Sequence, residues 1–153
     1  MDVDEQSGVH AWLVMWKAAR AVEAYAVKSI AGLEMCGSDF AVLEALLNKG
    51  PLPVNVIGRK VLLTSGSITT AIDRLEKKGL VERERDPADK RARIVHLTPE
   101  GRKLIKKAFA DHAADMERLS SVLETDERAT MIRLLKKIGL EAAQMLERDK
   151  EKR

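Results

Sequence analysis

Apolar residues recur along most of the chain with the period of an α-helix. Across residues 9–33 they lie three, four or seven positions apart, which predicts one long amphipathic helix. Two further stripes, across residues 105–123 and 131–145, alternate spacings of four and three. Thr98, followed by a proline, is expected to cap the first of these helices, and Thr125 to cap the second. Long helices are therefore predicted at both ends of the chain.

Three shorter helices are predicted in the middle of the chain. Ser38 is expected to cap the first, because a serine hydroxyl accepts from an unpaired N–H of the first turn. Gly50 followed by Pro51 marks its end. Pro53 suits the first position of the second helix, residues 54–61.

The third short helix, residues 65–78, has Thr64 as its expected N-cap and Gly79 at its end. Its predicted inner face is apolar and consists of Ile68, Ala71, Ile72 and Leu75. After Gly79, two short extended runs, residues 80–85 and 92–97, flank a polar turn. That pattern predicts a β-hairpin.

These elements predict a mostly α fold with a small β-hairpin wing, a winged helix-turn-helix that carries long N- and C-terminal dimerisation helices. Within one continuous domain we expect an N-terminal dimerisation helix (1–36), a DNA-binding region (37–101) and C-terminal dimerisation helices (102–153). The end helices have apolar stripes that one small DNA-binding module cannot cover. A two-fold partner is therefore expected, with a monomer whose arms fold back over the core as the alternative.

Charge is distributed unevenly over the 153 residues. The net charge is +3, yet residues 51–110 contain 14 lysines and arginines against 7 acidic residues. A basic middle segment between acidic flanks is typical of a protein that binds a polyanion. The sequence has no nucleophile elbow, phosphate loop or metal cluster, so an enzyme is not expected. We expect no cofactor. No run of 18 apolar residues occurs, so no membrane-spanning segment is expected. The acidic N-terminus lacks a signal-peptide layout, so a cytoplasmic location is expected.

Small polar residues occupy the predicted outer face of the helix at residues 65–78. Such side chains let a helix lie deep in the major groove, where hydroxyls donate to or accept from base edges and phosphates. The residues expected to contact DNA from this helix are Thr64, Ser65, Gly66, Ser67, Thr69, Thr70, Arg74 and Lys77. The alternative is ordinary capping and a solvated face, but the basic hairpin that follows favours DNA contact.

The hairpin carries a second set of expected DNA contacts: Arg83, Asp89, Lys90, Arg91 and Arg93. Asp89 and Arg91 lie two positions apart and would face the same side of a strand. We expect the carboxylate to orient the Arg91 guanidinium toward a narrow minor groove. The alternative is a solvated hairpin with a weak surface ion pair.

Residues 62–101, which read LTSGSITTAIDRLEKKGLVERERDPADKRARIVHLTPEG, resemble the MarR family of bacterial transcription regulators. The segments DRLEKKGLVER, the D-x-R at Asp89 and Arg91, and LTPEG carry the resemblance. It extends from the first helix to the last and is strongest over residues 38–107. The sequence looks most like the branch that includes quinone- and catechol-responsive regulators, although the family often has a basic or larger polar residue where Gly66 and Thr70 stand.

This resemblance implies a homodimeric regulator, usually a repressor, that binds double-stranded DNA and is released by a small phenolic or aromatic effector or by an oxidant. The family's effector pocket lies among helices that here carry Trp12, Trp16, Phe40, Phe109, His112 and Met116. Three of these residues have an ordinary alternative: Trp12 and Trp16 as dimer core, and His112 as a core histidine.

Cys36, near the start of a predicted helix, is a candidate redox sensor, with a small buried filler as the alternative. The family's sensing cysteine lies near the start of the first helix instead. His10, His96 and His112 fall on separate elements, so no metal site is expected.

The main functional alternative is a winged-helix module that senses a ligand or binds a protein without reading DNA.

Overall fold

The computed structural model describes residues 4–89 and 91–151 of the chain. Two compact units, Met1–Asp115 and Met116–Arg153, divide it. The first contains α1 (Gly8–Ile30), the 3-10 helix η1 (Ala31–Leu33), α2 (Gly37–Lys49), β1 (Leu52–Pro53), α3 (Val54–Lys60), α4 (Ser65–Lys77), β2 (Val81–Arg85) and β3 (Arg93–Leu97). Helix α5 (Pro99–Ser120) begins in the first unit and ends in the second, which also contains α6 (Thr125–Glu151). The predicted fold class, mostly α with a small β wing, is confirmed.

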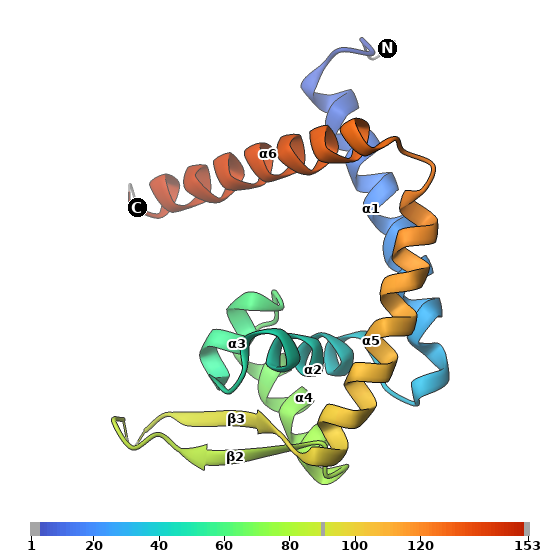
Figure 1. Ribbon diagram of the computed structural model, residues 1–153. Coiled ribbons are helices and arrows are strands. Elements are labelled where there is room, and N and C mark those ends of the chain that lie inside the picture. Colours follow the sequence, from blue (N-terminus) through green and yellow to red (C-terminus); the bar gives the residue numbers. More distant parts are fainter. Residues whose placement is uncertain (1–3, 90, 152–153) are drawn as a thin grey trace. The chain divides into compact units, whose positions relative to one another are not determined.

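One hydrophobic core holds α2, α3, α4, the strands and the start of α5 together (Figure 1). The predicted inner face of α4 is confirmed, since Ile68, Ala71, Ile72 and Leu75 are at most 2% exposed. Helix α3 packs closely on α4: a Cβ at Gly58 would lie 3.3 Å from the Ile68 side chain. The outer face of α4 is therefore the side left open to a ligand.

The sheet has three antiparallel strands in the order β1-β3-β2. The predicted hairpin is present, with Arg83 opposite Val95, and both its strands start one residue later than expected. Strand β1 was not predicted from the sequence. Pro53, expected as the first helical residue, instead pairs with Ile94 and occupies the N-cap of α3.

The helix starts show which capping predictions hold. Thr64 caps α4 as predicted, and Thr98 accepts from the N–H of Gly101 at the start of α5. The prediction for Ser38 is wrong, because α2 begins at Gly37 with Cys36 at its N-cap. The prediction for Thr125 is also wrong, because Thr125 is the first helical residue of α6.

The base of the wing is fixed to α5 by close backbone packing. A Cβ at Gly101 would lie 1.9 Å from the carbonyl oxygen of Leu80, so only glycine fits there. Thr98 donates its hydroxyl to the Gly79 carbonyl at 2.7 Å and its N–H to the Leu80 carbonyl. The start of α5 is therefore hydrogen-bonded to the segment that leads from α4 into the wing.

The end helices differ from this core in their burial. Ile30 is the one buried residue among the described residues of α1, and no described side chain of α6 is buried. The predicted helix at residues 9–33 changes to η1 for its last turn. The predicted stripe on α6 is exposed within the chain, with Leu135 at 46% and Ile138 at 49%.

Candidate nucleic-acid interface

The first two turns of α4 present exposed hydroxyl groups. Thr64 accepts from the N–H of Ser67 at 3.2 Å and donates its own proton to the Ser67 hydroxyl at 2.9 Å. Thr69 and Thr70 donate to the carbonyls of Ser65 and Gly66 at 2.9 and 3.0 Å. The hydroxyl of Ser67 therefore keeps its proton for an outside acceptor, whereas the two threonine oxygens keep lone pairs for an outside donor.

Gly66, in the first turn of α4, adds an open space to this surface. A Cβ there would meet nothing within 4 Å in the free protein. Ser65 and Lys77, at the two ends of the same helix, are exposed. The side of α4 that faces away from the core is therefore small and polar at its start.

Arg74, expected to reach DNA, is attached to the protein itself. Its Nη2 donates to Asp39 Oδ1 at 2.6 Å, and its Nε lies 3.2 and 3.3 Å from the two carboxylate oxygens. Asp39 is 1% exposed and was not singled out from the sequence. The hydrogen bond to Asp39 raises the pKa of the Arg74 guanidinium.

Arg83, also expected to reach DNA, lies between two carboxylates of α4. Its Nη2 contacts Asp73 and donates to Glu76 Oε2 at 2.6 Å, and its Nε donates to the same oxygen at 3.0 Å. The hydrogen bonds from Arg83 lower the pKa of Glu76, and Glu76 and Asp73 raise the pKa of Arg83. This arginine ties β2 to α4.

At the wing tip, Asp89 organises the backbone. Its carboxylate accepts from the N–H of Arg91 at 2.9 Å, and its carbonyl accepts from the N–H of Ala92. In the part of the chain that the structure describes, Asp89 forms no ion pair with Arg91. The expectation that Asp89 holds the guanidinium is therefore wrong in this form: Asp89 sets the turn from which Arg91 extends. Lys90, also expected to contact DNA, lies outside the described residues.

A groove of about 580 Å³ separates the wing from α3 and the start of α4. It is lined by Arg59 of α3, Ser65 and Thr69 of α4, and Arg91 and Arg93 of the wing, among others. Asp89 is the one acidic side chain among the described residues that line it. Arg59 was missed from the sequence because an arginine on a short helix carries no motif; only the packing of α3 beside the wing places it here.

The residues expected in an effector pocket do not form one cluster. Trp12 and Trp16 stack on each other with ring centroids 6.4 Å apart, and both are about half exposed. Phe40 and His112 form an edge-on ring contact at 5.0 Å. Phe109 packs against the hydrophobic core, and Met116 belongs to the second unit.

His112 and Ser29 share a short hydrogen bond. The Ser29 hydroxyl lies 2.6 Å from His112 Nδ1 and donates to the Ala26 carbonyl at 2.8 Å. Since a hydroxyl has one proton, both bonds form only if His112 Nδ1 is the donor. Ser29 thereby links α1 to α5.

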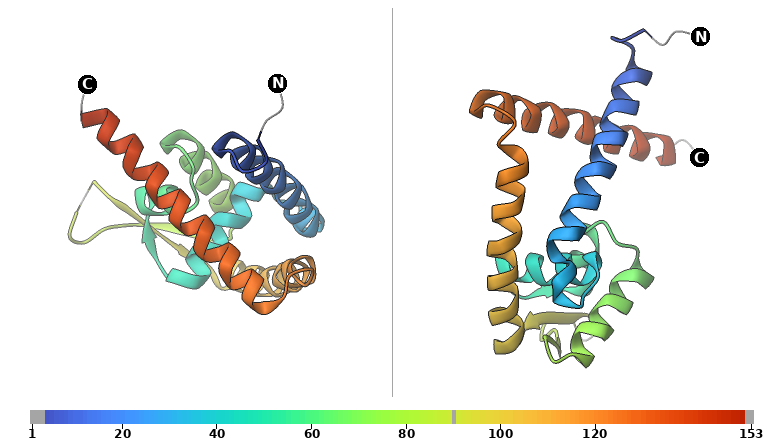
Figure 2. Two further views of the ribbon diagram at one scale, coloured as in Figure 1. Left: turned by 90° about the horizontal axis from the view of Figure 1, so that it is seen from above. Right: turned by 90° about the vertical axis from the view of Figure 1, so that its right-hand side faces the viewer.

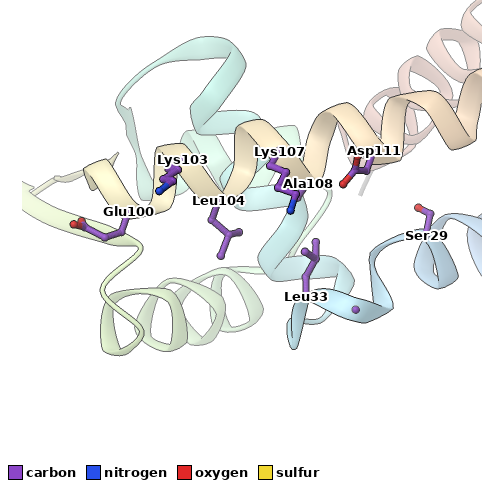
Figure 3. Close-up of a pocket in the computed structure, with 9 residues that line it drawn as sticks. Ser29, Leu33, Glu100, Lys103, Leu104, Lys107, Ala108 and Asp111 are labelled. Atoms are coloured by element: carbon purple, nitrogen blue, oxygen red, sulfur yellow. The ribbon is translucent and has the colours of Figure 1, made fainter.

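A cavity of about 560 Å³ lies between the end of α1, η1 and α5 (Figure 3). Figure 2 also shows the end of α1 beside the middle of α5. Leu33, Leu104 and Ala108 supply apolar surface. Two lysines and two acidic residues supply charge of both signs: Lys103, Lys107, Glu100 and Asp111. Ser29 also lines this cavity, and its hydrogen bond links the cavity to His112, which contacts Phe40.

Cys36, the redox candidate, is exposed and lies beside Arg74. Its Sγ is 3.2 Å from Arg74 Nη2 and 3.0 Å from the Ser38 hydroxyl. The alternative of a buried filler is therefore wrong, and a redox role stays a prediction.

Among residues 4–89 and 91–151, no group of histidine, cysteine and acidic side chains could hold a metal ion. Within the same residues, no helix is long and apolar enough to cross a membrane.

The MarR family pattern matches residues 38–92 of the chain. The HTH-type transcriptional regulator MhqR of Bacillus subtilis is 38% identical over 133 residues, which cover 87% of this chain and 92% of MhqR. Both comparisons include α4, and the family match extends to the wing.

Two solved structures resemble the fold over most of its length. The PcaV transcriptional regulator of Streptomyces coelicolor, in complex with its natural ligand, is 25% identical with a TM-score of 0.74, and the match covers 93% of this chain and 99% of PcaV. A variant of Escherichia coli MarR complexed with operator DNA is 24% identical with a TM-score of 0.77, and the match covers 90% of this chain and 99% of the MarR chain.

Proposed function

Since the chain belongs to the MarR family of DNA-binding transcriptional regulators, we propose that it is a homodimeric repressor of a palindromic operator. Helix α4 enters the major groove and the wing lies beside the minor groove. One observation carries this proposal: α4 is fully buried on its core side and exposes small hydroxyl residues next to a groove lined by arginines.

The hydrogen bonds within α4 define what it can read. Ser67 offers a proton to a base acceptor such as guanine O6 or N7. Thr70 offers a lone pair to an exocyclic amine and a methyl group to thymine. Gly66 leaves space for close approach of the DNA, and the unpaired amides at the start of α4 favour a phosphate nearby.

The wing groove supplies charge. Arg91 extends from the Asp89 turn, and Arg59 faces the same groove from α3. Within the described residues neither guanidinium has a carboxylate partner, so both are available to the DNA backbone or the minor groove. The remaining expected contacts, Lys77, Lys90 and Arg93, belong to the same proposal.

The exposed apolar faces of α1 and α6 support the homodimer. Large apolar side chains at 40–65% exposure follow α6 over about four turns, including Leu135 and Ile138. A two-fold partner with the same stripe would cover them. The symmetric pair would then present two α4 helices about 34 Å apart, one turn of DNA.

Sedimentation tests the dimer directly. We expect a dimer at micromolar concentration, and a monomer after Leu135→Glu, because a charge in the stripe opposes its burial. The adjacent Lys136→Glu is the matched control and should leave the dimer intact. A wild-type monomer would contradict the pairing.

We also propose that a small phenolic or aromatic effector occupies the cavity between α1, η1 and α5. Its apolar floor suits a ring, and Ser29 connects it to His112 and Phe40. A thermal-shift screen with phenols and aromatic acids tests this, because a ligand bound only by the folded state raises the melting temperature. Leu104→Trp, which fills the cavity, should abolish the shift while Lys106→Ala, outside it, should not.

Selection from a random pool of duplexes tests the DNA-reading function. The wild-type protein should enrich a palindrome and bind it more weakly as salt rises, because each neutralised phosphate releases counterions. Failure to enrich any duplex would favour the alternative, a winged-helix ligand sensor or interaction module. Repression is tested by placing the selected duplex in front of a reporter: expression should fall when the protein is present.

A further inference from the structure

We propose that Asp39 is a positioning residue for DNA reading: through Arg74 it sets the rotation of α4 on α2, and Arg74 is not itself a phosphate contact. This inference rests on the proposed function, since it concerns how the recognition helix is held. Asp39 lies in α2, on no element expected to touch DNA.

The ion pair is enforced by burial. Asp39 is 1% exposed and accepts three contacts from Arg74, of 2.6, 3.2 and 3.3 Å. A buried carboxylate without a partner is strongly unfavourable, so Arg74 cannot leave Asp39 for a phosphate without loss of stability. Arg74 therefore stays in place whether or not DNA is bound.

A second set of contacts holds the same end of α4. Arg74 Nη2 also lies 3.2 Å from the Cys36 Sγ and 3.3 Å from the Ser38 hydroxyl. Lys78, the C-cap of α4, donates its ammonium to the Glu34 carbonyl at 2.8 Å. Residues 34–39 thus hold the C-terminal half of α4 in place through their contacts with the side chains of Arg74 and Lys78.

The spacing along α4 connects this fastening to the reading face. Ser67, Thr70 and Arg74 are related by three and four positions, so they follow one face of the helix. Fixing the direction of Arg74 consequently fixes the directions in which the two hydroxyls point. Base-edge hydrogen bonds depend on those directions, whereas attraction to the backbone charge does not.

The test compares Asp39→Asn, Arg74→Ala and the double variant in the full-length protein. Each is titrated by fluorescence anisotropy against the duplex selected by the wild type and against a random-sequence duplex of equal length, over a range of salt. We expect each single variant to lose about tenfold or more on the selected duplex and little on the random one. The salt slope should be unchanged, and the double variant should bind no more weakly than either single variant.

Arg74→Lys is the matched control, since it keeps the charge but not the two-nitrogen contact. It should lose discrimination between the duplexes, although less than Arg74→Ala. A fall in salt slope of about 0.9 in Arg74→Ala, or equal losses on both duplexes, would show that Arg74 is a phosphate contact and overturn the proposal. Wild-type affinity of Asp39→Asn for the selected duplex would overturn it as well.

Removing one partner of a buried ion pair destabilises a fold, so a paired apolar variant keeps the test independent of folding. Asp39→Leu/Arg74→Met replaces both charges with side chains that pack without a polar partner. Circular dichroism should show it folded, and it should still lose the preference for the selected duplex. A folded double variant that reads this duplex like the wild type would contradict the positioning role. If the wild type enriches no duplex, the proposed function itself fails.

Discussion

Two groups of arginines lie around α4, and they differ in whether the guanidinium is paired with a carboxylate. Arg74 and Arg83 are held by carboxylates, one by the buried Asp39 and the other by Asp73 and Glu76. Arg59 and Arg91 line the groove beside the wing, and within the described residues neither has an ion-pair partner. All four belong to the same basic stretch of sequence. The comparison teaches that a positive charge near a recognition helix can serve either the fold or the DNA.

The largest effect on DNA affinity is expected from Arg91→Ala. Loss of a guanidinium from the wing tip should weaken binding by about 1–3 kcal/mol, while the melting temperature stays the same because Arg91 is exposed. Anisotropy titration and thermal unfolding measure the two quantities. Lys106→Ala, which removes the same charge from α5, should bind nearly as the wild type does. Equal losses in the two variants would mean that net charge, and not the groove, decides affinity.

Asp89→Ala sharpens the same comparison. Its carboxylate holds the backbone of Arg91, so removing it should weaken binding, by less than Arg91→Ala does. The change also removes a negative charge, which by itself would strengthen binding to DNA. Tighter binding of the variant would therefore contradict a role for Asp89 in shaping the wing tip.

Arg83→Ala should affect stability more than DNA affinity. It releases β2 from α4 and leaves Asp73 and Glu76 without their cation, so the free energy of unfolding should fall by about 1 kcal/mol. Arg83→Lys should recover only part of the lost stability, because a lysine ammonium lacks the planar two-nitrogen geometry with which the guanidinium contacts both carboxylates. Urea denaturation measures the difference; a stable variant with strongly reduced DNA binding would move Arg83 into the other group.

Acid should weaken the same link. The pKa of Glu76 is lowered in the folded state, so its contribution to stability is present above its ordinary value of 4.5 and is lost as the pH falls through the folded pKa. Glu76→Gln should therefore show a smaller loss of stability than the wild type between pH 5 and about pH 3. Parallel pH profiles for the two proteins would contradict this coupling.

The smallest effect is expected from Gly66→Ala. Nothing in the free protein would meet the added methyl group, and alanine favours a helix over glycine, so stability should rise by a few tenths of a kcal/mol. DNA binding should weaken if α4 approaches the bases closely. Unchanged affinity would place α4 further from the groove floor than proposed.

Local sequence patterns predicted most of the elements of the first unit. The three- and four-residue spacing of apolar positions predicted α4 and its buried face. Thr64 and Gly79 predicted its two ends to within one residue. Strand β1 was not foreseen because two residues carry no pattern of their own; its pairing with β3 is a long-range contact. Ser38 failed as a cap because its hydroxyl lies beside Cys36 and Arg74 instead.

The candidate site was less predictable than the fold. The sequence marks which residues are basic, but not which of them meet a carboxylate from another helix. The partner of Arg74 lies 35 positions away on α2, and that of Arg83 lies on the preceding helix. The cavity beside Ser29 arises where α1 and η1 approach α5, which no local motif records.

The dependence of DNA affinity on salt tests the central distinction most directly. The slope of log affinity against log salt concentration should become shallower by about 0.9 in Arg59→Ala and in Arg91→Ala, if each releases one phosphate contact. It should stay at the wild-type value in Arg74→Ala and in Arg83→Ala, whose charges are already neutralised within the protein. Equal changes of slope in all four variants would contradict the division into arginines that hold the fold and arginines that bind DNA.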